Sequence, residues 1–309
     1  MKRFREIIVE LSYNCNLSCE MCGFGNKINP YNEKKFMSFE FYKTIADTFA
    51  NKSQTFRLNG RGESTIHPDF ESILEFTHKS YPGLNINLFT NLMIEKHSLI
   101  KSLTENSVQL FVSIDSPVSE ELSSIRKGAN LKTIESNLLQ IRSMTPRPFI
   151  VFTVQECNVN RIYDMALFAR RMNCNMIYNT IRRDEGIECF IDIVTKEIDN
   201  IHDSLSKAKR LLANNNLSCL FPNQLSGIPL ESSGANRTYG TKERCPALES
   251  ELCILHDGSV TPCNMFNPYV FGNFKKETFE QIWKGDRRKE FINKHKQHYY
   301  CKNCANMGV

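Results

Sequence analysis

The 309-residue sequence contains no stretch of about 18 uninterrupted apolar residues, so it gives no sign of a membrane-spanning helix. Its N-terminus, MKRFREIIVELSYN, is basic but lacks the apolar core and the small-residue cleavage site of an export signal. The sequence also shows no internal repeat and no low-complexity tract. These absences predict a cytoplasmic globular protein without membrane contact, and its 41% of hydrophobic residues are enough to form a substantial core.

Positive charge is concentrated near the C-terminus. The net charge is +5, and residues 275–304 contain nine Lys or Arg against four Asp or Glu. A solvated helix face is the commoner explanation of such a run. Because no aromatic interleaving and no nucleic-acid-binding motif accompany it, we do not expect nucleic acid as a partner.

The chain has twelve cysteines, which is many for a protein predicted to stay in a reducing compartment. Disulfides are rare there, so clustered cysteines indicate metal ligands or catalytic thiols. One cluster lies in residues 15–22 and the other in the last 65 residues. The first consists of Cys15, Cys19 and Cys22, and the second of Cys245, Cys253, Cys263, Cys301 and Cys304.

Short β-rich runs alternate with amphipathic helical patterns in the first two thirds of the chain. The predicted strands are 5–11, 54–59, 84–90, 108–114, 149–154 and 175–180. Predicted helices between them include 38–51, 68–80, 131–144 and 160–173. This alternation requires a parallel sheet with helical crossovers. The predicted fold class is therefore α/β, a partial (β/α)6 TIM-like barrel whose site lies at the C-terminal ends of the strands.

The remainder of the chain has a different pattern. A helix is expected over about 195–215, and a Gly/Ser/Pro/Asn-rich connector occupies 222–240. Beyond it, Asp257-Gly258 indicates a β-hairpin, and a helix is predicted over 278–295. The predicted domains are accordingly a barrel over 1–220, a linker or active-site loop over 221–244, and a small C-terminal hairpin and helix domain over 245–309.

The spacing C-x-x-x-C-x-x-C places the first three cysteines in the loop after the first strand. They could be core residues on one helix face, but Asn14, Asn16, Gly23 and Gly25 make a poor buried helix. Structural zinc sites use four ligands, and this cluster offers three. Three thiolates on a 4Fe-4S cluster would instead leave one iron open to a substrate or cofactor.

In this spacing and position the sequence resembles the radical S-adenosylmethionine (SAM) enzymes. The resemblance implies a 4Fe-4S cluster on Cys15, Cys19 and Cys22, with SAM chelated at the open iron. It also implies reductive cleavage of SAM to a 5′-deoxyadenosyl radical, which abstracts hydrogen from the substrate. The electron would come from a reductant such as flavodoxin or ferredoxin.

Further segments match this family in chain order, over about 5–180. The resemblance implies a SAM-binding role for residues near each strand end: Met21, Gly62, Glu63, Asn91, Ser113, Asp115 and Arg126. Gly62 and Glu63 would hold the SAM ammonium, Ser113 and Asp115 would lie near the ribose, and Arg126 would bind the carboxylate. The chain departs from the family pattern at Met21, where an aromatic residue is usual, and at Arg61 and Leu92, where glycine is usual.

The C-terminal cysteines form a second possible set of metal ligands. Cys245 and Cys263 bracket the predicted hairpin, and Cys301 and Cys304 form a C-x-x-C pair. Four thiolates would suit a structural zinc ion. After a radical SAM barrel, however, they resemble a Twitch or SPASM domain, which implies a second, auxiliary 4Fe-4S cluster. Cys253 lies inside the hairpin and is expected to pack rather than to bind metal.

A set of SAM contacts has no purpose in a mere electron carrier, so an enzyme is the favoured interpretation. Relatives with this domain pair act on sugars and aminocyclitols, on peptides or on other enzymes. The first strand begins by about residue 5, without a preceding leader-binding domain, which favours a small polyhydroxylated substrate over a peptide. We expect a radical SAM oxidoreductase, most simply a dehydrogenase. An epimerase would need a hydrogen-atom donor, and Cys219 and Cys189 are the candidates.

Overall fold

The structure is a computed structural model that divides into two compact units by its internal contacts. The first unit contains residues 1–15, 24–88 and 238–309, and the second contains 16–23 and 89–237. The residues that the structure describes are 4–23, 35–180, 191–221, 224–225, 228–229, 245–263, 269–298 and 301.

The sheet of the first unit has the strand order β14-β13-β12-β1-β3-β4. Its strands are β1 (Glu6–Val9), β3 (Thr55–Arg57), β4 (Asn85–Thr90), β12 (Glu251–Ile254), β13 (Ser259–Thr261) and β14 (Gly272–Asn273). β12, β1, β3 and β4 run parallel, whereas β13 and β14 are antiparallel to their neighbours. β4 continues into the second unit from Phe89.

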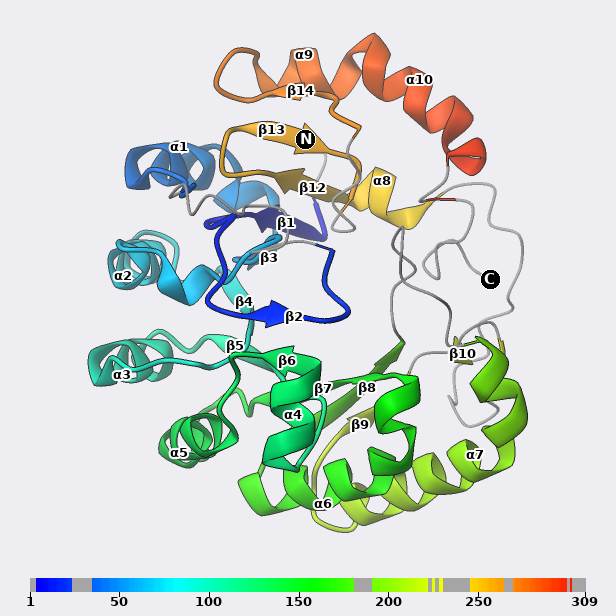
Figure 1. Ribbon diagram of the computed structural model, residues 1–309. Helices are drawn as coiled ribbons and strands as arrows, with labels where there is room; N and C mark the ends of the chain where they lie inside the picture. The colour runs from blue at the N-terminus through cyan, green and yellow to red at the C-terminus, as the bar shows by residue number, and fades with distance from the viewer. Residues whose placement is uncertain are drawn as a thin grey trace. The chain divides into compact units, whose positions relative to one another are not determined.

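Helices α1 (Phe39–Phe49) and α2 (Phe70–Ser80) lie along one side of these strands (Figure 1). Ser38 caps α1 by accepting a hydrogen bond from the Phe41 amide. The buried residues of both helices recur every three or four positions, which is the pattern of an amphipathic helix. The Tyr42 hydroxyl on α1 lies 2.5 Å from the Thr77 hydroxyl on α2 and fixes their packing.

The C-terminal part of the first unit holds the predicted hairpin, formed by β12 and β13. Its helices are α8 (Pro246–Ser250), α9 (Phe279–Lys284) and α10 (Asp286–Lys294). The first unit as a whole also contains short 3-10 helices: η2 (Ala50–Lys52) and η3 (Ser64–Ile66) in its N-terminal part, and η5 (His295–Gln297) after α10. The single helix predicted over 278–295 is wrong, because Gly285 adopts an extended conformation (φ −66°, ψ 156°) that separates α9 from α10.

The second unit contains a parallel sheet with the order β5-β7-β8-β9. These strands are β5 (Gln109–Ser113), β7 (Phe149–Val154), β8 (Asn175–Thr180) and β9 (Cys219–Leu220). Two antiparallel pairs accompany it: β2 (Ser18–Cys19) with β6 (Arg126–Lys127), and β10 (Gln224–Leu225) with β11 (Ile228–Pro229). Phe89, Phe111 and Phe149 stack with ring centroids 4.4 and 5.5 Å apart, which marks one face of this sheet.

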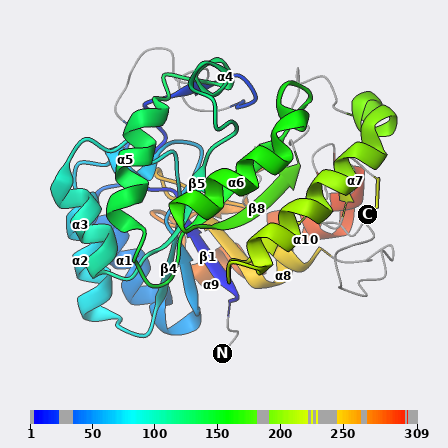
Figure 2. The same ribbon diagram turned by 90° about the horizontal axis from the view of Figure 1, so that it is seen from below.

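The opposite face of this sheet is covered by helices. The helical elements of the second unit are α3 (His97–Glu105), α4 (Ser119–Ile125), α5 (Leu131–Ile141), η4 (Glu156–Arg161), α6 (Ile162–Met172) and α7 (Ile191–Ala213). Leu110, Val112 and Ile150 are fully buried on this covered face. α6 and α7 lie side by side (Figure 2).

All six predicted strands are present, and each predicted helix between them is found with shifted ends, so the predicted α/β fold class is confirmed. α3 and α4 complete the alternation. Most of the predicted connector 222–240 lies outside the described residues. Within the described parts of the chain, we find no helix with the length and apolarity of a membrane span.

Candidate cofactor site

In the first unit, the segment that leaves β1 lies against the turn that follows β3. The Gly62 amide donates to the Ser12 carbonyl at 3.2 Å, and the Glu63 amide donates to the Asn14 carbonyl at 2.8 Å. A Cβ atom on Gly62 would lie 2.2 Å from the Asn14 carbonyl oxygen, so this close approach requires glycine. Two predicted SAM-binding residues are thus fixed beside the segment that leads to Cys15.

The Glu63 side chain is buried, with 4% of the residue exposed. Its Oε1 atom accepts hydrogen bonds from the amide and the hydroxyl of Thr65, at 3.2 and 2.8 Å. A buried carboxylate is stable only with charged or hydrogen-bonding partners. Glu63 therefore suits a cationic ligand group such as the SAM ammonium.

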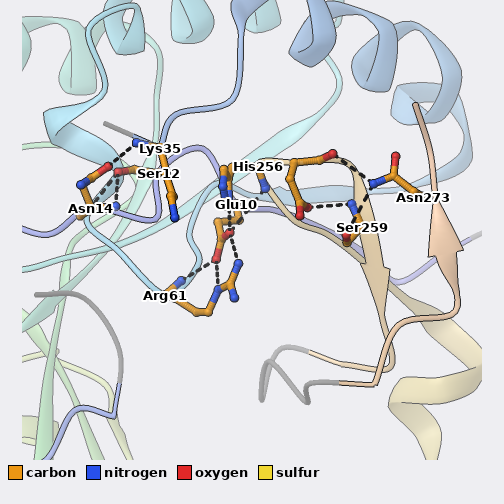
Figure 3. Close-up of polar contacts among 9 residues, drawn as sticks. Glu10, Ser12, Asn14, Lys35, Arg61, His256, Ser259 and Asn273 are labelled. Carbon is orange, nitrogen blue, oxygen red and sulfur yellow. Dashed lines mark hydrogen bonds and ion pairs between the residues drawn. The ribbon is translucent and has the colours of Figure 1, made fainter. Parts of the chain in front are cut away.

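Arg61, directly before this turn, binds the buried carboxylate of Glu10 at the end of β1. Arg61 Nε lies 2.8 Å from Glu10 Oε2 and Arg61 Nη2 lies 2.8 Å from Oε1, while the Arg61 amide donates to Oε2 at 3.0 Å. His256 Nδ1 lies 2.8 Å from Oε1 (Figure 3). Although burial opposes ionisation, the hydrogen bonds from Arg61 and His256 lower the pKa of Glu10 to about 2.

Tyr13 adds an aromatic ring to this cluster. The Arg61 guanidinium lies 4.3 Å from the Tyr13 ring centroid, and the His256 ring stacks on the same residue at 5.5 Å. Glu10, Tyr13 and His256 are not among the site residues predicted from the sequence. The available signal was an acidic residue inside an otherwise apolar strand pattern, IIVEL, because such a residue requires a buried partner.

In the second unit, the short β2–β6 ladder brings a predicted cluster ligand to a predicted SAM ligand. Cys19 on β2 is the register partner of Arg126 on β6. The Cys22 amide donates to the Cys19 carbonyl at 3.2 Å, which forms a turn that also contains the half-buried Met21. Arg126 Nη1 lies 3.8 Å from the Cys19 sulfur.

The Arg126 guanidinium is anchored by Asp115, which follows β5 and is fully buried. Arg126 Nε donates to Asp115 Oδ2 at 2.7 Å, and the Thr153 amide donates to Oδ1 at 2.8 Å. Burial raises the pKa of Asp115, although the charge of Arg126 and the Thr153 hydrogen bond act in the opposite direction. Both carboxylate oxygens therefore have protein partners.

The surroundings of the first three cysteines fit an iron–sulfur cluster. Cys15, Cys19 and Cys22 are half-buried. Burial raises the pKa of the Cys19 thiol, while the positive charge of Arg126 favours the thiolate, which is the form that binds metal. Soft thiolates in a partly dry environment are the usual ligands of 4Fe-4S clusters.

Asn91, after β4, forms a local network in the second unit. Its Nδ2 atom donates to Asn16 Oδ1 at 2.8 Å, and its Oδ1 atom accepts from the Met93 amide at 2.9 Å. Leu92 adopts a left-handed conformation (φ 55°) at the position where the family pattern has glycine. The turn is therefore retained without the usual residue. Ser113, the last residue of β5, is half-buried.

The C-terminal cysteines lie in the first unit. Cys245 is buried, Cys263 and Cys301 are half-buried, and Cys304 lies outside the described residues. Cys253 packs against Ile8 and Leu255, as an apolar residue would. Among the residues described, no three His, Cys, Asp or Glu side chains are placed to bind one metal ion. Each cysteine of a 4Fe-4S cluster binds a different iron atom, so the ligands of such a cluster do not need to converge on one metal ion.

Of the two candidate hydrogen-atom donors, Cys189 lies outside the described residues, and Cys219 lies away from the predicted site residues of the second unit. It is the register partner of Met176, whose side chain is fully buried on the helix-covered face of the sheet. The next residue on that face of β8, Tyr178, donates to the Ile162 carbonyl at the start of α6. Burial raises the pKa of Cys219 to about 12. The structure therefore brings Cys19, Asp115 and Arg126 together, but not Cys219.

Comparison with known proteins gives relatives that match most of this chain, among them the following two. AlbA of Bacillus subtilis, an antilisterial bacteriocin subtilosin biosynthesis protein, is 26% identical over 89% of this chain and 58% of its own length. The chain thus spans little more than half of that relative. The cysteine-type anaerobic sulfatase-maturating enzyme of Clostridium novyi is 24% identical over 98% of this chain and 86% of its own length.

A solved structure with a similar fold is SuiB from Streptococcus suis bound to S-adenosylmethionine. It matches with a TM-score of 0.73 at 14% identity, over 100% of this chain and 72% of SuiB. Identity this low shows similarity of fold alone.

Two protein families match the chain in separate segments. Residues 9–159 match the radical SAM superfamily. Residues 245–305 match SPASM, an iron–sulfur cluster-binding domain. These matches include the predicted ligands of both clusters, and the two families imply 4Fe-4S clusters and SAM as cofactors. The chain therefore carries a radical SAM domain over residues 9–159 and a C-terminal SPASM domain over residues 245–305.

Proposed function

We propose that Cys15, Cys19 and Cys22 hold the SAM-binding cluster and that Arg126 binds the SAM carboxylate. The observation that carries this proposal is the 3.8 Å distance from Arg126 Nη1 to the Cys19 sulfur. A guanidinium beside a cluster ligand suits a carboxylate chelated at the same cluster. When bound, the cluster and SAM supply a 5′-deoxyadenosyl radical that abstracts a hydrogen atom from the substrate.

The other SAM contacts follow from the same assignment. Glu63, whose carboxyl group is buried, would bind the ammonium group. Met21, Gly62, Asn91 and Ser113 would contact the remainder of the cofactor. We assign Asp115 a different role from the expected ribose contact. Because both of its oxygens accept protein hydrogen bonds, it would hold Arg126 in place.

We further propose that the substrate is a polypeptide. The support comes from the two relatives, since one acts in the biosynthesis of a bacteriocin and the other matures a sulfatase. A small polyhydroxylated substrate is the alternative. Both substrates would use the same hydrogen abstraction, so the assignment of the cluster and SAM residues does not depend on this choice.

The proposed outcome is oxidation of the substrate rather than epimerisation. Oxidation requires an electron acceptor, and an auxiliary cluster on Cys245, Cys263, Cys301 and Cys304 would supply one. Epimerisation requires a hydrogen-atom donor, and the candidate Cys219 shares the helix-covered face of its sheet with Met176. A reaction in deuterated water distinguishes these outcomes. Oxidation gives a product two hydrogens lighter without carbon-bound deuterium, whereas epimerisation gives one solvent deuterium, lost in Cys219→Ala.

The proposal is tested by transfer of deuterium from substrate to 5′-deoxyadenosine in the anaerobically reconstituted enzyme with SAM and dithionite. One reaction contains synthetic peptides with deuterated cysteine and serine, and the other contains deuterated glucose and inositol. We expect deuterium from the peptides. Transfer only from the polyols would overturn the peptide assignment. Persistent 5′-deoxyadenosine formation after Cys15, Cys19 and Cys22 are all changed to alanine would overturn the cluster assignment.

A further inference from the structure

Glu10 has an unusually complete set of partners for a carboxylate at a strand end. It is fully buried and accepts five hydrogen bonds: three from Arg61 and two from His256. The Arg61 guanidinium engages both oxygens, and the Arg61 amide and the His256 ring each bind one of them. The position and the plane of the carboxylate are therefore fixed from two sides (Figure 3).

The backbone around Arg61 is shaped to this contact. A Cβ atom on Gly60 would lie 2.2 Å from Glu10 Cγ, so the Glu10 side chain passes over a position that can hold only glycine. Arg61 is followed directly by Gly62 and Glu63, whose amides bind the carbonyls of Ser12 and Asn14. The ion pair and the two backbone hydrogen bonds thus join the same two segments.

We propose that Glu10 is a positioning residue for the SAM site. Through its ion pair with Arg61, Glu10 holds the Gly62–Glu63 turn in place. This inference rests on the proposed role of Glu63 as the partner of the SAM ammonium. Glu10 and Arg61 do not need to touch SAM. Their contribution is to fix the turn, and His256 in the C-terminal hairpin keeps the shared carboxylate oriented.

A second ion pair in the same sheet provides a matched control. Arg57 on β3 forms an ion pair with Glu6 on β1. Each of these residues lies four positions before its counterpart, Arg61 or Glu10, in the same segment of the chain. The arginine side chains have nearly equal exposure, 19% for Arg57 and 18% for Arg61. The Arg57 pair joins the strands themselves and does not adjoin the turn. If both ion pairs only stabilise the sheet, changing Arg57 or Arg61 should have similar effects on the turn and on SAM binding. If the Glu10–Arg61 pair positions the turn, only the change at Arg61 should affect them.

The test compares Arg61→Lys, Glu10→Gln and Arg57→Lys with the wild-type chain. Lysine keeps the positive charge but cannot engage both carboxylate oxygens as the guanidinium does. The first measurement is amide hydrogen exchange at Gly62 and Glu63 in the protein without clusters, which needs no activity. The second is the dissociation constant of SAM for the reconstituted protein. Thermal unfolding of each variant confirms that it is folded.

We expect Arg61→Lys and Glu10→Gln to accelerate exchange at Gly62 and Glu63 by about tenfold or more, because the turn opens locally. SAM should bind about tenfold more weakly to both variants. Arg57→Lys should leave both quantities within about twofold of wild type. If Glu10→Gln does not fold, the comparison of Arg61→Lys with wild type is sufficient, because this variant retains the Glu10 carboxylate and its contacts with His256.

Equal effects of Arg57→Lys and Arg61→Lys on exchange and on SAM affinity would overturn the positioning role. Unchanged exchange in Arg61→Lys would overturn it as well. Glu63→Ala separates this inference from the proposed function. If that variant binds SAM as tightly as wild type, the assignment of Glu63 fails, while hydrogen exchange still decides whether Glu10 and Arg61 hold the turn.

Discussion

Arg126 donates from Nε to Oδ2 of the fully buried Asp115 at 2.7 Å, so the arginine proposed to bind SAM already compensates a buried charge. Arg126→Ala should therefore affect the protein even without SAM. Leaving Asp115 unpaired should lower the free energy of unfolding by about 3 kcal/mol, measured by urea denaturation of the cluster-free chain. SAM should bind the reconstituted variant roughly ten- to a hundredfold more weakly.

The neighbouring residue Lys127 gives the control for this prediction. It pairs with Glu20 at the surface, where both side chains are more than half exposed. Lys127→Ala should change stability by no more than about 0.5 kcal/mol, because exposed ion pairs are screened by water. If Arg126→Ala were as stable as Lys127→Ala, the Asp115 contact would have no energetic importance.

Gly62→Ala should disrupt the turn that carries Glu63. The added methyl group would meet the backbone oxygen of Asn14, which cannot move as a flexible side chain could. We expect a loss of about 1–3 kcal/mol in unfolding free energy and weaker SAM binding. Gly83→Ala is the matched control, since nothing lies within 4 Å of the position its methyl group would occupy. Equal behaviour of the two variants would show that the turn tolerates a side chain.

The ionised Glu10 carboxylate should make stability depend on pH. Its pKa is lowered from 4.5 to about 2 in the folded protein, so its contribution is complete well above pH 4.5 and is lost as the pH falls toward 2. The stability difference between wild type and Glu10→Gln should shrink by about 2 kcal/mol between about pH 6 and pH 3. Urea unfolding of the cluster-free proteins measures it, and a difference that does not change with pH would contradict the prediction.

The C-terminal cysteines should hold the second cluster. Reconstituted wild type should contain about eight irons per chain, and a Cys245→Ala/Cys263→Ala variant about four, with SAM cleavage retained. Cys253→Ala is the control, because Cys253 packs against Ile8 and Leu255 and should keep all eight irons. Iron and zinc analysis decides the question. About four irons and one zinc in wild type would instead support a structural zinc site.

Several features of the fold follow from local sequence. The alternation of β-rich runs and amphipathic stretches predicts the strands and most helices, because each pattern reflects the face that an element must bury. The sequence pattern does not predict the interruption at Gly285, because the flanking residues continue a helical pattern and the extended backbone conformation of Gly285 ends α9. The hairpin was predicted from Asp257-Gly258, but the parallel pairing of β12 with β1 was not.

For the site, local sequence is enough to predict the chemistry, from three cysteines at a fixed spacing and an ordered series of polar residues after successive strands. These signals are local, because they depend on positions a few residues apart. Which side chains come into contact depends on the tertiary fold. Glu10, Arg61 and His256 come from segments separated by about 50 and 195 positions, and Asp115 reaches Arg126 only because helix α4 between them returns the chain to the end of β5. Such partners depend on strand register and on the geometry of loops, since an ion pair needs its atoms within a few ångströms, and no periodic pattern in the chain encodes that distance.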